Sequence, residues 1–100
     1  MNEKLKKDIS AGKTVERAEM LMLLQAALQA GEPNFVRLLA EDWLNAYPYD
    51  LTVELIRAKA YFKNGTAEKA IKIAARLVEL DPEYVEAQDL LASTARRVKP

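Results

Sequence analysis

The sequence predicts an all-α fold built from antiparallel helix pairs, and three features of its pattern lead to this prediction. Apolar residues recur at helical spacing through most of the chain, and half of its 100 residues are hydrophobic. Two helix-stopping glycines, Gly31 and Gly65, are 34 residues apart (65 − 31), and two prolines, Pro48 and Pro82, are also 34 residues apart (82 − 48). A period of 34 residues indicates a repeated helix pair. We therefore expect five helices, preceded by a short sixth if the N-terminus is ordered.

The first repeat is predicted to hold a helix over residues 15–30 and a second over residues 34–46. Thr14 can cap the first helix through its hydroxyl, and Gly31 can end it in the left-handed conformation. Pro33 suits the start of the second helix, where a missing N–H costs nothing. The first helix is apolar nearly all round, whereas the second has a polar stripe and therefore one buried face.

The second repeat is predicted to hold helices over residues 51–63 and 67–80, and a fifth helix follows over residues 83–97. The optional sixth helix would cover residues 3–9. The asymmetry of the first pair returns, because the third helix is apolar on two sides and the fourth has a solvent stripe. A helix with two apolar sides packs on both or offers one to a partner. The residues expected to cap or stop these helices are Asp50, Gly65, Asp81 and Pro82.

Residues 51–84 combine small and turn-forming side chains at characteristic positions, namely Ala58, Tyr61, Gly65, Ala70 and the ending Leu80-Asp81-Pro82. This pattern resembles the tetratricopeptide repeat, in which such residues let two helices approach closely and fix the turn to the next repeat. The resemblance implies a short right-handed solenoid that binds other proteins and acts as an interaction module or scaffold.

Residues 17–50 resemble the same repeat less closely. Leu24 and Trp43 stand where the family prefers small residues, and Val36 replaces its usual alanine. Residues 85–97 resemble the first helix of a third repeat, and such arrays often end in a solvating helix of this kind. Because about three repeats are usual for stability, the chain either belongs to a longer array or completes its burial by self-association. The first-repeat positions that fit the family are Leu23, Ala26, Gly31 and Pro48.

Net charge and hydropathy restrict the classes of partner that we expect this chain to bind. The 15 basic and 15 acidic residues give a formal net charge of zero, whereas nucleic-acid binders usually carry a basic excess. The longest apolar run, residues 20–24, is far below the roughly 20 residues that span a bilayer. We expect neither a nucleic-acid nor a membrane partner, and the lack of a signal peptide favours the cytoplasm. Lysines suggest a basic segment over residues 1–13, ahead of a repeat domain over residues 14–97 and a tail over residues 98–100.

Catalysis is not expected. The chain contains neither cysteine nor histidine, which removes the usual ligands of zinc, iron and copper. Glu41 and Asp42 are neighbours on a predicted helix and point apart, and no nucleophile lies beside a base. We therefore predict no catalytic residues, no metal site and no cofactor. The four tyrosines lie near the repeat junctions, where we expect them to pack.

The resemblance implies a concave groove lined by the first helix of each pair. We predict that an amphipathic helix or apolar segment of a partner protein binds there. Three alternatives stay open: these residues belong to the core, the N-terminal segment covers them, or they mediate self-association as a homodimer or in a longer array. Some family members clamp a peptide carboxylate in this groove, but the matching positions lack the required basic residues. The predicted groove residues are Leu21, Gln25, Leu28, Leu55, Lys59, Phe62 and Lys63.

Overall fold

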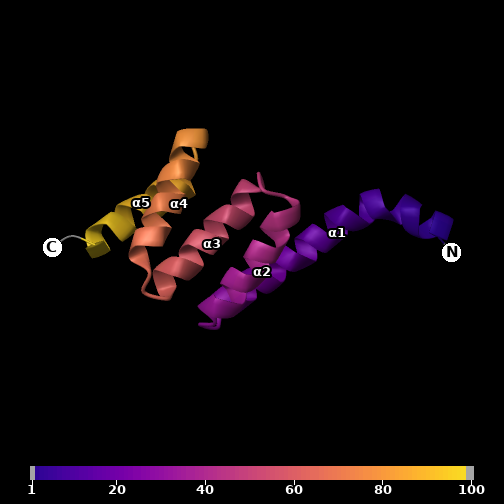
Figure 1. Cartoon of the computed structure of the whole chain (residues 1–100), viewed down its shortest axis with the longest axis horizontal. Helices are drawn as coiled ribbons and strands as arrows, with labels where there is room; N and C mark the ends of the chain where they lie inside the picture. The colour runs from indigo at the N-terminus through magenta and orange to yellow at the C-terminus, as the bar shows by residue number, and fades with distance from the viewer. Residues whose placement is uncertain (1, 99–100) are drawn as a thin grey trace.

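The computed structural model describes the backbone of residues 2–98 and the side chains of residues 16–97. Over these residues the chain forms five helices and no strand, joined by short turns (Figure 1). Each helix packs against the next, and α3 also contacts α1 and α5. The predicted all-α class and its repeat solenoid are confirmed. The helices are α1 (Asn2–Gln29), α2 (Pro33–Ala46), α3 (Leu51–Lys63), α4 (Ala67–Leu80) and α5 (Val85–Val98).

The repeat period is visible in the backbone of the turns. Gly31 and Gly65 adopt φ angles of +80° and +84°, which favour glycine. At both, the glycine N–H bonds to the carbonyl three residues back, and the next N–H reaches the carbonyl five residues back. This paired arrangement closes the end of α1 and of α3 in the same way. The spacing read from the sequence is therefore a true structural repeat.

The start of α1 differs from the prediction. The helix begins at Asn2 and runs to Gln29, so Thr14 lies inside it and is not its N-cap. The short helix expected over residues 3–9 is part of the same α1. Nothing in this stretch forces a break, because it contains no proline and a single internal glycine costs a helix only about 1 kcal/mol. The lysines of the predicted basic segment lie outside the described side chains, and the domain boundaries stay a prediction.

The start of α5 also differs, because the helix begins at Val85 and not at Glu83. Residues 81–84 form a turn, in which the Tyr84 N–H donates to the Asp81 carbonyl at 3.0 Å. The Asp81 carboxylate accepts from the Glu83 N–H at 3.2 Å, so it holds this turn and does not cap α5. Pro82 consequently precedes the helix. The first backbone bonds of α5 instead reach the Tyr84 carbonyl.

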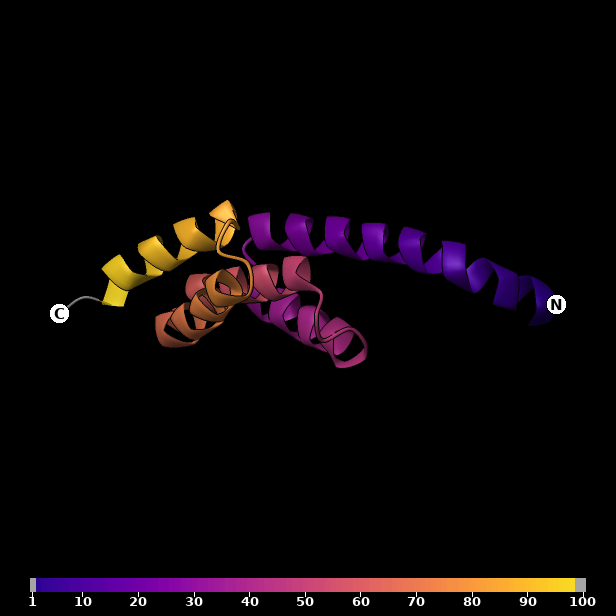
Figure 2. The ribbon, with the colours of Figure 1, turned by 90° about the horizontal axis from the view of Figure 1, so that it is seen from above.

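The core consists of two clusters of buried side chains. One lies among α1, α2 and α3 around Leu24, Val36 and Val53, each fully buried. The other lies among α3, α4 and α5 around Leu77 and Ala87. Buried alanines at the contacts let the helices approach closely. Seen from above, α1 and α5 lie along one side of the molecule and the other helices lie beneath them (Figure 2).

Candidate functional site

A hollow of about 830 Å³ opens beside α1, next to the C-terminal end of α2 and the turn that leads to α3. Its walls are mainly apolar and aromatic, and one ion pair closes its edge. Helix α1 supplies one wall, and α2 with the following turn supplies the other. The lining residues are Arg17, Ala18, Leu21, Trp43, Ala46, Tyr47, Pro48, Tyr49 and Asp50.

The hollow exists because the two repeats differ at equivalent positions. In the second repeat, Tyr84 is half-buried, packs against the core cluster and hydrogen-bonds to Thr52. Burial, together with the nearby Glu86 carboxylate, raises the pKa of the Tyr84 phenol. The first repeat has Asp50 in place of Tyr84 and Ala18 in place of Thr52. The smaller side chains leave the space open.

Asp50 holds the edge of the hollow and fixes three neighbouring groups. Arg17 donates from Nε to Oδ2 at 2.8 Å and from Nη2 to Oδ1 at 2.9 Å. The Trp43 indole N–H donates to Oδ2 at 2.8 Å. The Val53 N–H donates to Oδ1 at 3.4 Å, which confirms the prediction that Asp50 caps α3.

The electrostatics of this edge follow from the same bonds. The hydrogen bonds from Arg17 hold the pKa of Asp50 below its ordinary value, assisted by Trp43 and opposed by burial. In return, the hydrogen bond to Asp50 raises the pKa of Arg17. Both groups therefore stay charged and paired across the ordinary pH range. The pair can orient Trp43, but its carboxylate is already engaged as an acceptor and is poorly suited to act as a base.

The aromatic wall gives the hollow its binding character. The rings of Trp43 and Tyr47 have centroids 4.5 Å apart and planes inclined by 35°. Tyr49 is 80 % exposed, so its expected packing at the repeat junction is wrong, because its side chain projects at the rim of the hollow. Such rings offer a large contact area with few rotatable bonds. The arrangement is suited to hold an apolar side chain.

The apolar residues of the predicted groove occupy three different environments. Leu21 lines the hollow, whereas Leu28 is half-buried against the first core cluster. Leu55 is only 2 % exposed and belongs to the second cluster, so a partner cannot reach it in this arrangement. Phe62 is half-buried, and the Arg97 guanidinium lies 4.8 Å from its ring centroid. Of these four, only Leu21 faces the hollow.

The polar residues of the predicted groove lie at or near the surface. Gln25 and Lys63 are exposed. Lys59 is half-buried, and its Nζ lies 3.7 Å from a Glu86 carboxylate oxygen. The end of the predicted groove near α3 and α5 is thus charged, whereas its end near α1 is aromatic. Sequence reasoning missed the aromatic residues, and the signal that could have found them is the exchange of Tyr84 for Asp50 between the repeats.

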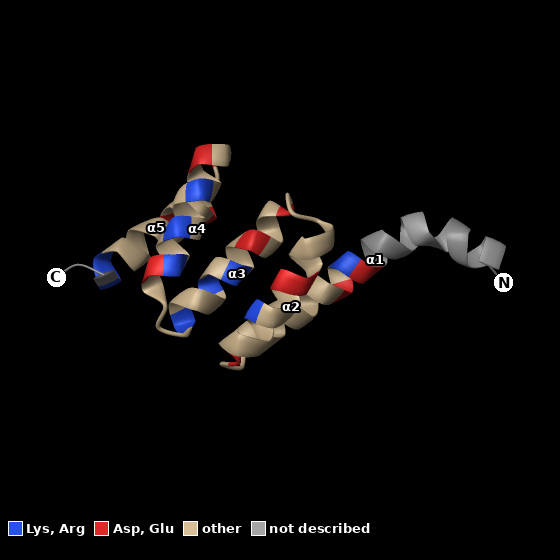
Figure 3. Cartoon of the chain, viewed as in Figure 1, with Lys and Arg blue, Asp and Glu red and all other residues tan. Residues whose placement is uncertain are grey.

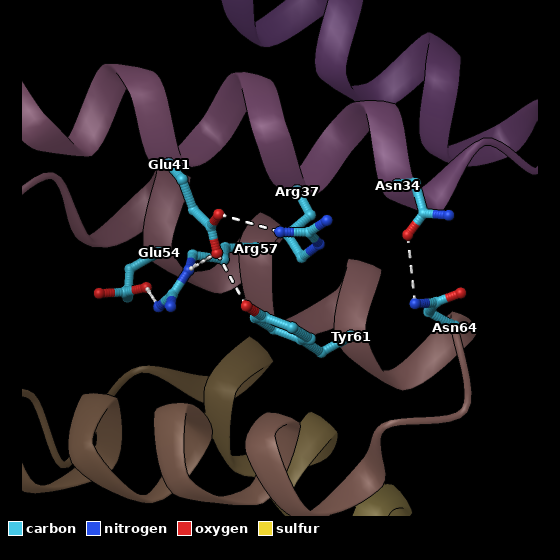
Figure 4. Close-up of polar contacts among 7 residues, drawn as sticks. All are labelled: Asn34, Arg37, Glu41, Glu54, Arg57, Tyr61 and Asn64. Carbon is cyan, nitrogen blue, oxygen red and sulfur yellow. Dashed lines mark hydrogen bonds and ion pairs between the residues drawn. The ribbon is translucent and has the colours of Figure 1, made fainter.

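A second polar cluster joins α2 to α3 (Figure 4). Glu41 accepts from the Tyr61 hydroxyl at 2.8 Å, from Arg57 Nε at 3.0 Å and from Arg37 Nη1 at 3.1 Å. Arg57 also donates to Glu54 at 2.8 Å. Burial raises the pKa of Glu41, but the hydrogen bonds from Tyr61 and Arg57 outweigh it and leave the pKa lowered. The charged and polar groups of this cluster hydrogen-bond to one another, so the cluster links the first repeat to the second.

Helices α2, α3 and α4 each carry both acidic and basic residues (Figure 3). On α3, Glu54 is followed by Arg57, Lys59 and Lys63, and on α4, Lys69, Lys72 and Arg76 lie between Glu68 and Glu79. Within the part of the chain that the structure describes, none of the helices combines the length and apolarity that a membrane span requires.

Comparison with known proteins identifies the family of the second repeat. Residues 51–94 match the family model of the tetratricopeptide repeat. This match covers α3, α4 and most of α5, which include the residues that carried the resemblance in the sequence. The curated proteins and the solved structures contain no match. Tetratricopeptide repeats generally mediate protein–protein interaction and are typically non-catalytic.

Proposed function

Because the chain belongs to the tetratricopeptide repeat family, we propose that it is a protein-interaction module whose hollow beside α1 receives an apolar side chain from a partner segment. The observation that supports this proposal is the open, aromatic-walled space where the second repeat is filled by Tyr84. A space that one repeat closes and the other leaves open is suited to a ligand, since apolar concave sites with a few fixed polar groups are typical binding sites.

The charges around the hollow restrict the chemistry of the partner. Arg17 and Asp50 neutralise each other at the edge, so a strongly charged side chain gains little there. A bulky aliphatic or aromatic side chain would instead cover Leu21 and the ring of Trp43. Beyond the hollow, the exposed Gln25 lies one helical turn from Leu21 and can contact the polar flank of the same segment. We expect the segment to continue toward Lys59 and Lys63, as the predicted groove implies.

The proposal can be tested with peptides selected from a random display library against the purified chain. Binding of a selected peptide would be measured by fluorescence anisotropy. Tyr49→Ala, which removes a ring from the rim, and Ala18→Phe, which fills the space, should each weaken binding about tenfold or more. Val85→Ala is the matched control, because Val85 is 61 % exposed and lies at the start of α5.

Loss of affinity in both hollow variants with an unchanged control would support the site. Selected peptides whose affinity is the same for all three variants would show that the hollow is not the binding site. Far-ultraviolet circular dichroism on each variant separates lost binding from lost folding.

A further inference from the structure

One flank of α1 is apolar and uncovered, although the same flank is buried on α3. Met22 is 71 % exposed, and Ala26 is also exposed. Their counterparts in the second repeat, Ile56 and Ala60, are 3 % and 0 % exposed because α2 packs over them. The second repeat thus serves as an internal reference for the first.

The corresponding flank of α5 is also covered. The equivalent residues one repeat further along, Leu90 and Thr94, are 8 % and 0 % exposed beneath α4. The second helix of each pair thus covers the first helix of the following pair. Among the described residues, nothing covers this flank of α1.

Helix α2 extends the uncovered surface. Phe35 is 44 % exposed and Leu38 is 59 % exposed, whereas their counterparts on α4 are the polar Lys69 and Lys72. Phe35 and Leu23 also line a common depression of about 320 Å³. An exposed apolar surface of this kind marks an interaction site. We name it the α1–α2 face, and it consists of Met22, Leu23, Ala26, Phe35 and Leu38.

We propose that a second copy of this chain covers the α1–α2 face, with the two copies joined face to face about a twofold axis. The other end of the helix array, at α5, is not a suitable partner for the α1–α2 face. Helix α5 already covers α4 there, and its exposed Asp89 and Arg96 would be buried against apolar side chains. Burying such charges unpaired is costly.

A helix resembling α2 is also a poor occupant. On α3, the polar residues Arg37 and Glu41 of α2 meet Arg57 and Tyr61. At the positions that correspond to Arg57 and Tyr61, α1 has Leu23 and Ala27, which offer no side-chain hydrogen bonds. The occupant must therefore be apolar along the contact, and the α1–α2 face itself has that property. A self-complementary surface is what a twofold dimer requires.

The polar margin of α1 fits the same arrangement. If two α1 helices pack antiparallel, with the axis level with the midpoint between Met22 and Ala26, the exposed Glu19 of one copy lies level with Gln29 of the other. The amide of Gln29 can donate to the Glu19 carboxylate. Small side chains at Ala26 and Ala30 allow the two backbones to approach closely. Arg17 and Leu21, which line the hollow, lie about 140° around α1 from Met22 and Ala26, and Ala18 lies between the two surfaces. The dimer therefore does not depend on the proposed function.

The absence of cysteine from the sequence makes disulfide trapping a clean test. With the axis at this level, Met22 of one copy lies opposite Ala26 of the other, so a mixture of the Met22→Cys and Ala26→Cys variants should form a covalent dimer under mild oxidation. Lys69→Cys, exposed on α4, is the control and should stay monomeric. Head-to-tail stacking does not bring residue 22 of one copy to residue 26 of another, so an uncrosslinked mixture of these two variants would overturn the twofold arrangement.

Solution mass gives an independent readout. Light scattering behind a sizing column should show the cysteine-free protein moving from 11.2 kDa to twice that mass as concentration rises. Leu23→Glu should raise the dimer dissociation constant about tenfold or more, whereas Leu80→Glu should not, although Leu80 is 55 % exposed. A mass that stays at the monomer value up to millimolar concentration, or equal effects of both variants, would refute the dimer.

Discussion

Replacing Asp50 with alanine is expected to destabilise the fold by about 2–3 kcal/mol, because one carboxylate serves three donors. Loss of the α3 cap costs about 1 kcal/mol. The Trp43 N–H loses its acceptor in a half-buried position, which costs about 1 kcal/mol. The ion pair with Arg17 adds at most about 1 kcal/mol, because the Arg17 side chain is 40 % exposed to solvent.

Two further variants separate these contributions. Asp50→Asn keeps an oxygen for the cap and should cost about half as much as Asp50→Ala. Arg17→Ala should lower the free energy of unfolding by less than about 1 kcal/mol, and this loss should be smaller at high salt. Urea unfolding followed by circular dichroism gives the free energy of unfolding for each variant. The fluorescence of Trp43, the single tryptophan of the chain, reports on the same site directly.

A small and undifferentiated effect would refute this account of Asp50. If Asp50→Ala cost less than about 1 kcal/mol, the cap and the indole bond would not be formed in solution. If the double variant with Arg17→Ala were additive with the two single variants, the ion pair would be absent.

Three further outcomes follow from the polar contacts and the turns. Because the pKa values of Asp50 and Glu41 lie below their ordinary values in the folded chain, their contribution to stability is complete above about pH 5 and is lost as the pH falls through the folded pKa values. Urea midpoints between pH 7 and pH 3 should show this decline, and Glu41→Gln should flatten it. Tyr61→Phe removes the hydroxyl that donates to Glu41 and should cost about 1 kcal/mol in the same unfolding assay. Gly65→Ala should lower the melting temperature by an amount equivalent to about 1 kcal/mol, from backbone strain alone, because no atom lies within 4 Å of the added Cβ.

The parts of the fold that local signals control were predictable from the sequence. The bounds of α3 and α4 agree with the prediction, because Asp50 caps one end and a left-handed glycine closes another. The start of α5 was misplaced because an aspartate before a proline can cap a helix or hold a turn. Asp81 holds a turn, through its bond to the Glu83 N–H. Thr14 has the same ambiguity, since a capping residue type does not exclude continuation of the helix.

The candidate site was less predictable because it depends on which surfaces cover which. The spacing of apolar residues along a helix predicts which way the Leu55 side chain points, but not which other helices cover it. Leu55 is buried in the cluster that α5 completes. The hollow has a different origin, namely the exchange of a large residue for Asp50 in one repeat only. A family resemblance treats both repeats as copies and conceals such a difference. Comparison of the repeats with each other reveals it.

That difference leads to a final prediction, in which the first repeat is given the side chains of the second. The triple variant Arg17→Leu, Ala18→Thr and Asp50→Tyr places at the hollow the residues that occupy positions 51, 52 and 84. The loss of the cap and ion pair should be partly offset by burial of the new ring, which contributes about 2 kcal/mol. The variant should therefore keep its helical spectrum and its state of association, but lose affinity for peptides selected on the wild type. Undiminished peptide affinity in a folded triple variant would show that the open hollow is only a packing difference between the repeats.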